Sequence, residues 1–344
     1  MLSGSLSVVQ PTASSLASIA AESDIEGLNP WIKEHGTSIG NLLHHFSNNS
    51  ASIMGQPFDP QLWDLACRHK FLLSAVLAAS ACHLRHYSPN PTPHHIAELS
   101  QTSVAITTLK STLALPLNKE RADALLCMAV MLNGVAFAYV TTKSLSTSWV
   151  FSNNSDRLDW LDLQLRFKNL EEATSQFRES SLLQPILDAA NGQGPPTDHA
   201  RDMSFESVPT AWKMLIGDKD TQNYRLYREP IRLLAELRIT EPHRNNSIAY
   251  FGLAMKLEDG FRDLLFERDL RALWILGYWL GLLGRLNIWW CSRRVERDWT
   301  AVLCFLREKE LGQRPGDEGR MWQVLITDLS VASEWPPPRT GIGR

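Results

Sequence analysis

The sequence predicts an all-α fold, a multi-helix bundle with no sheet of more than two short strands. Apolar residues recur three and four positions apart through most of the chain, which is the period of an amphipathic helix. Segments in which apolar and polar residues alternate, as they do in strands, are nearly absent. Hydrophobic residues make up 44% of the 344 residues and charged residues 21%, a balance typical of a chain with a large core.

Three parts are expected along the chain. Residues 1–36 are rich in Ser and Ala and lack a sustained apolar period, so we interpret them as a flexible N-terminal arm. Residues 37–330 are expected to form the helical domain. A subdivision could fall near residues 191–209, because the loop NGQGPPTD lies there. Residues 331–344 are expected to be a flexible tail.

The helices can be justified in order. Residues 37–46 carry apolar side chains at helical spacing, and residues 70–87, KFLLSAVLAASACHLRHY, are apolar or small on nearly all sides, which predicts a buried helix. In residues 98–115, an apolar stripe indicates an amphipathic helix; it comprises Leu99, Ile106, Leu109 and Leu113. Further helical patterns cover residues 121–140, 182–189, 211–216, 224–237 and 247–266.

The stretch from Glu267 to Leu306 is the centre of the predicted fold, with five of the twelve tryptophans. Thirteen residues without a charge lie between Arg271 and Arg285, too few for a membrane span, which needs about 20. They are expected to form a buried core helix, with Asp269 as its N-cap. In the segment that follows, the charged residues are expected to face water and to pair with one another; they are Arg293, Arg294, Glu296, Arg297 and Asp298.

One face of the core helix is expected to carry Trp274, Gly277, Gly281, Gly284 and Ile288, because their spacings are three and four. Three glycines inside a helix cost roughly 1 kcal/mol each relative to alanine, so something must offset them. Close approach of a neighbouring helix is one explanation. The other is a groove floored by backbone in which an apolar ligand lies. The five residues are therefore the candidate ligand-binding residues.

No set of residues points to catalysis or to a metal centre. Cys82, His83 and His86 share a predicted helix, and His94, His95 and Glu98 resemble half of a di-metal motif, but neither group has further ligands nearby. Nucleophile-elbow, Walker, dinucleotide-binding and zinc-protease motifs are absent from the sequence. We expect no enzyme, no catalytic residues, no metal ligands and no cofactor.

Charge and cysteine usage indicate an intracellular protein without a DNA-binding surface of its own. The net charge of −3 gives no general attraction to nucleic acid, and we assign no DNA-binding residues. The five cysteines lack zinc-site spacing and are interpreted as reduced thiols. No Lys or Arg precedes Lys33, which argues against a secretory signal or a transit peptide.

Several segments resemble the fungal-specific transcription factor domain, in particular that of zinc-cluster regulators of the sterol uptake control type. The resemblance covers most of the chain from about residue 38 to 325, in the family's order. Its segments are LLHHF (42–46), HKFLLSAVLAASACHLRHY (69–87), RADALLCMAVMLNGVAFAY (121–139), SWVFSNNSDRLDWLDLQLRF (148–167), YREPIRLLAELR (227–238), and LGYWLGLLGRL with IWW (276–290).

The resemblance implies a nuclear regulator of RNA polymerase II transcription whose helical domain senses a small molecule, in this group a sterol, or a protein partner. Such regulators carry an N-terminal cluster of six cysteines that binds zinc and a basic linker that contacts DNA, yet residues 1–32 contain no cysteine and no basic residue. Zinc is therefore expected only with an additional N-terminal cluster, and DNA contact only through such a module or indirectly.

Two other functions remain open from the sequence. The chain could be an adaptor or co-regulator that never binds DNA and works with the transcription machinery or another regulator. Less expected is an enzyme that acts on a lipid or terpenoid, since no acid, base, nucleophile or metal set supports it. A homodimer is compatible with each of these functions.

Overall fold

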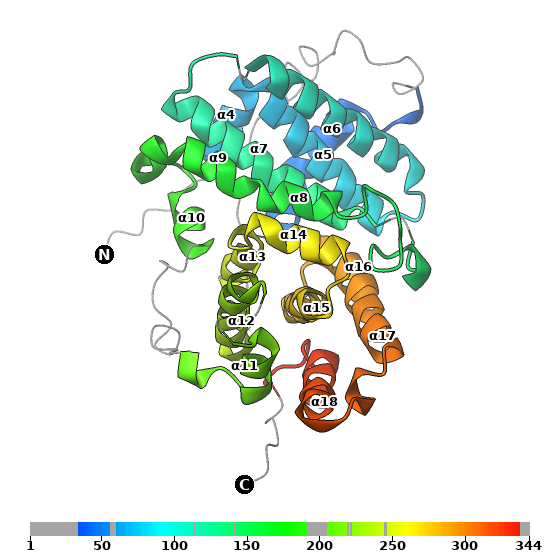
Figure 1. Cartoon of the computed structure of the whole chain (residues 1–344). Coiled ribbons are helices and arrows are strands. Elements are labelled where there is room, and N and C mark those ends of the chain that lie inside the picture. The colour runs from blue at the N-terminus through cyan, green and yellow to red at the C-terminus, as the bar shows by residue number, and fades with distance from the viewer. Residues whose placement is uncertain are drawn as a thin grey trace, which may run out of the picture. The chain divides into compact units, whose positions relative to one another are not determined.

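The computed structural model describes residues 34–55, 60–112, 114–140, 142–190, 205–218, 220, 222–243 and 246–337. These residues form helices and connecting turns without any strand, so the predicted all-α fold is confirmed (Figure 1). Most of the expected arm and tail, and most of the potential boundary at 191–209, lie outside the described residues.

The helices follow one another with short connections. The first are α3 (Ile39–Met54), α4 (Pro60–Arg68), α5 (Lys70–Tyr87), α6 (Thr92–Thr112), α7 (Lys119–Ala138), α8 (Asp159–Leu165), α9 (Phe167–Ala173) and α10 (Gln184–Ala190). Then come α11 (Thr210–Ile216), α12 (Tyr224–Ile239), α13 (Ser247–Met255), α14 (Asp259–Phe266), α15 (Leu270–Gly284), α16 (Trp289–Arg294), α17 (Thr300–Glu308) and α18 (Gly316–Ser330). One π-helical turn, Val295–Trp299, joins α16 to α17.

The chain divides into two compact units. The first comprises Met1–Ala136 with Ala173–Leu183, and the second comprises Phe137–Glu172 with Gln184–Arg344. The first division therefore falls at residue 136, within α7, and not in the loop near 191–209.

In the first unit α5 is the central helix, packed against α3, α4 and α6. It is buried along nearly its whole length, as its apolar and small side chains predict. A small apolar cluster joins it to its neighbours; its members are Leu42, Leu43, Leu73, Leu77, Ala81 and Ala97. The pairing of α5 with α6 is the most extensive between any two helices of the described chain.

In the second unit α15 is the central helix. Every residue from Ala272 to Leu283 is buried, and α12, α13, α17 and α18 pack around it. The predicted cap is confirmed, because the Asp269 side chain accepts a hydrogen bond from the backbone N–H of Ala272 at 2.8 Å. The prediction of a buried, tryptophan-rich core helix is confirmed.

One described helix, α7, is long and apolar enough to cross a membrane by length and composition, and 67% of its apolar window is buried. The bent pair α4 and α5, with 119° between the helices, passes the same test when taken together. Buried core helices of globular proteins share these properties.

Candidate functional site

The glycine face of α15 is filled by side chains of the same unit. A Cβ atom built on Gly277 would lie 2.6 Å from Cγ1 of Val302, and one on Gly281 would lie 2.5 Å from Cβ of Ala332. At Gly284 the nearest atoms would be 3.3 Å away. The glycines therefore admit α17 and the end of α18 at close range, which supports helix packing over a ligand groove at these positions.

The two ends of the predicted face do not line a groove either. Trp274 is fully buried, and its indole N–H donates to the carbonyl of Leu325 at 2.7 Å. The helix ends at Gly284, so Ile288 does not continue its face; Ile288 is the N-cap residue of α16. The expectation that Ile288 shares the face is wrong because the turn at Asn287, with φ of 47°, redirects the chain.

The histidine and cysteine groups are engaged within the first unit. Nδ1 of His83 lies 3.0 Å from Nε2 of His45, and Nε2 of His83 lies 3.1 Å from the Ser52 hydroxyl. Burial lowers the pKa of His83 to about 4, and the neighbouring His45 lowers it further. His94 contacts the Thr37 hydroxyl at 2.7 Å. No group of three or more His, Cys, Asp or Glu among the described residues is arranged to hold a metal ion.

Glu98, from the half-motif for two metals, pairs with Arg85. One carboxylate oxygen accepts from Nη2 of Arg85 at 3.1 Å, and both side chains are buried between α5 and α6. Cys82 lies beside this pair, with its sulfur 3.6 Å from Nη2 of Arg85. Burial is the main cause that raises the pKa of the Cys82 thiol well above its usual range, so the thiol is neutral and not a ready metal ligand.

A buried charged cluster lies at the π-helical turn of the second unit. Asp298 is fully buried and accepts from Nη1 of Arg294 at 3.2 Å and from Nε of Arg297 at 2.7 Å. Arg294 also donates to the backbone carbonyls of Phe137 at 2.7 Å and Tyr139 at 3.0 Å. Burial lowers the pKa of Arg294 to about 10, which leaves the guanidinium charged at neutral pH.

The expectation that these three residues face water is wrong. A π-helical turn contains an extra residue, so the side chains after it are rotated relative to an α-helix of the same sequence. The cluster is completed from a distant segment, because the Ser148 hydroxyl donates to Asp298 at 2.8 Å and the Trp160 ring centroid lies 4.4 Å from the Arg294 guanidinium carbon. Every identified partner lies within the chain, so the cluster joins residues 137–160 to the C-terminal helices.

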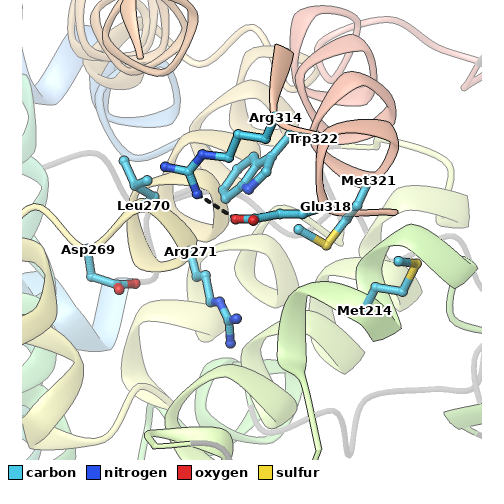
Figure 2. A pocket seen from close by; sticks show the side chains of 8 residues that line it. All are labelled: Met214, Asp269, Leu270, Arg271, Arg314, Glu318, Met321 and Trp322. Carbon is cyan, nitrogen blue, oxygen red and sulfur yellow. Dashed lines mark hydrogen bonds and ion pairs between the residues drawn. The ribbon is translucent and has the colours of Figure 1, made fainter. Parts of the chain in front are cut away.

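The second unit also contains a cavity of about 410 Å³ between the start of α15, α11 and α18 (Figure 2). Its lining residues are Met214, Asp269, Leu270, Arg271, Arg314, Glu318, Met321 and Trp322. Met321 and Trp322 are buried, whereas Met214 on the opposite wall is exposed. This volume lies within the 300–1,000 Å³ range that is common for small-molecule sites.

The charged groups of the cavity differ in how fully they are engaged. Arg314 and Glu318 form an ion pair at 2.5 Å on α18, which Figure 2 shows as a dashed line. Asp269 caps α15 and raises the pKa of Tyr227, which burial raises first, to about 12. Arg271 makes a long hydrogen bond of 3.5 Å to the Ile216 carbonyl and lies over the Tyr227 ring at 5.7 Å. A guanidinium has five N–H donors, so Arg271 retains donors for a ligand.

Sequence reasoning missed this cavity because its walls come from three separate helices. Two local signals point to parts of it: the Asp269 cap places Arg271 in the first turn of α15, and Arg314 and Glu318 stand four residues apart. Comparison of the chain with protein-family models, with curated proteins and with solved structures found no match.

Proposed function

We propose that this chain is the regulatory domain of an RNA polymerase II transcription regulator that acts in the nucleus. It is controlled by a small apolar molecule, such as a sterol, or by a protein partner, and it catalyses no reaction. Contact with DNA comes from another module or from a partner protein. This function rests on the sequence resemblance described above.

The single observation that supports the proposal most is where the resembling segments lie. Four of them coincide with α5, α7, α12 and α15, which include the most buried helices of the chain. A resemblance confined to surface loops would be a weaker argument, because cores determine folds. The all-α fold is the fold that the resemblance implies.

The cavity of Figure 2 is the proposed effector site. Its buried wall, Met321 and Trp322, suits an apolar body, and Arg271 suits a hydroxyl or carboxylate at one end of that body. An amphipathic molecule of sterol or fatty-acid size matches both features. Met214 on the exposed wall has the flexible, polarizable side chain that adapts to such ligands.

The test of regulation is a tethered reporter. The full chain is fused to a heterologous DNA-binding domain, and reporter transcription is compared with that of the DNA-binding domain alone at equal protein level. We expect a change of about fivefold or more, up or down. An unchanged reporter with a folded, nuclear fusion protein would overturn the proposal. An adaptor would change the reporter only in cells that contain its partner regulator.

The test of the effector site is titration of the purified chain with oleate and, separately, with a sterol in cyclodextrin, followed by tryptophan fluorescence. Saturable quenching is expected for at least one of them. Arg271→Ala should weaken binding about tenfold or more, since it removes a charged hydrogen-bond donor. The matched control is Arg320→Ala, an exposed arginine on α18 outside the cavity. Equal quenching in both variants would exclude this cavity as the site.

A further inference from the structure

The amphipathic helix α6 packs with the face opposite to the one that its sequence predicts. Its buried side chains are small or polar, among them Glu98, Gln101 and Ala105, whereas Leu99 is 49% exposed and Ile106 is 43% exposed. The apolar stripe expected to face the core therefore points away from it. The reason is α5, whose alanines admit only small residues at such close range.

The exposed apolar face is the unusual feature here, because large apolar side chains at helical spacing normally mark a contact surface. The polar side adds to this mismatch. The Oε1 atom of Gln101 and the hydroxyl of Ser100 are buried without a hydrogen-bond partner. A helix that buries unpaired polar atoms while it exposes leucine and isoleucine gains less from its own fold than from a partner on its outer face.

The spacing along this face is symmetric about the point between Thr102 and Ser103. Leu99 and Ile106 lie at equal distances on the two sides of that point, and so do Ile96 and Leu109, which are half-buried. In an antiparallel pair of identical helices, each residue meets the residue at its mirror position, as a two-fold axis requires. Leu99 of one copy would then meet Ile106 of the other, and the small Ser103 would lie near the axis.

Charge favours the same arrangement. Glu98 is buried in its pair with Arg85, so Lys110 is the exposed full charge among the described residues of α6. Parallel pairing would place the two Lys110 side chains next to each other. Antiparallel pairing separates them by about 22 Å along the helix axis, given a rise of 1.5 Å per residue. It also sets the two helix dipoles head to tail.

We propose that the outer face of α6, defined by Ile96, Leu99, Thr102, Ser103, Ile106 and Leu109, docks against the same face of a second copy of this chain in antiparallel orientation. The dimer places two regulatory domains about a two-fold axis. This inference stands on α6 alone and does not depend on the proposed effector site, which lies in the other unit.

The experiment is sedimentation or light scattering of the full chain over a range of concentrations. The wild type is expected to dimerise, and Leu99→Glu or Ile106→Lys should each weaken self-association about tenfold or more, because each buries an unpaired charge. Both positions are exposed, so the variants should fold, which far-ultraviolet circular dichroism checks. Ser111→Glu, on the exposed side of α6 outside this face, is the control and should leave the dimer intact.

A mixture of the two variants tests the register. One Leu99→Glu chain and one Ile106→Lys chain restore a complementary charge pair only if residue 99 of one copy meets residue 106 of the other. Dimers should therefore return on mixing. A wild type that is monomeric at all concentrations would overturn the proposal. So would a dimer that neither variant weakens, since another face would then form it.

Discussion

The carboxylate of Asp298 accepts a hydrogen bond from Arg294, one turn earlier, at 3.2 Å with both side chains buried. A buried ion pair is costly to form and more costly to break, because removal of one partner leaves an uncompensated charge in a low-dielectric interior. The relationship therefore makes the π-helical turn one of the most mutation-sensitive points of the second unit.

Asp298→Asn is expected to destabilise the chain by about 3–5 kcal/mol, because two buried arginines lose their counter-charge. Urea unfolding followed by tryptophan fluorescence measures the change. Glu296→Gln is the matched control: Glu296 lies in the same turn, and its pair with Lys143 is exposed, so the loss should stay below about 1 kcal/mol. Equal losses in the two variants would contradict the assignment of a buried cluster.

Substitutions along the glycine face of α15 should form a graded series. Gly281→Ala brings a Cβ to 2.5 Å from that of Ala332 and should destabilise by about 1–3 kcal/mol, and Gly281→Leu should destabilise more. At Gly284 the nearest atoms lie at 3.3 Å, so Gly284→Ala should stay within about 1 kcal/mol of the wild type, helped by helix propensity. Thermal and urea unfolding check the order. A neutral Gly281→Leu would show that space exists over this face after all.

Stability of the first unit should fall as the pH decreases from about 6.5 to about 4. The pKa of His83 is lowered from 6.5 to about 4 in the folded chain, so over this range the unfolded chain binds the proton that the folded chain does not. The contribution is at most about 1.4 kcal/mol per pH unit. Other acidic groups titrate in the same range, so the comparison is with a variant.

His83→Asn removes the titrating ring and should flatten the decrease in the free energy of unfolding between those pH values. His44→Gln is the control, because His44 is exposed on α3 and its removal should leave the slope unchanged. A slope that is identical in the wild type and in both variants would show that His83 protonates equally in the folded and unfolded chains.

Local patterns were sufficient for most of the fold. Helical spacing predicted the all-α fold, and the uncharged stretch after Arg271 predicted α15 together with its Asp269 cap. These features depend on residues within a few positions of one another, which a single sequence contains. The resemblance to a known domain agreed with the same helices.

The faces of two helices could not be predicted, for different reasons. In α6 the side toward the core is chosen by the small residues of α5, so Leu99 and Ile106 stay outside. After Arg294 the π-helical turn breaks the period on which the amphipathic prediction depends, and the carbonyl of Phe137, far away in sequence, completes the charged cluster. The cavity likewise required the positions of α11, α15 and α18, which depend on packing between distant segments.

The measurement that tests the account most directly is reporter transcription by the tethered chain as the concentration of the sterol or fatty acid that binds is varied. For the wild type the account predicts a saturable change of about fivefold or more, and for Arg271→Ala a dose–response shifted about tenfold or more, with Arg320→Ala behaving as wild type. A reporter that equals the DNA-binding domain alone at every concentration, for a wild-type fusion shown to be folded, would contradict it.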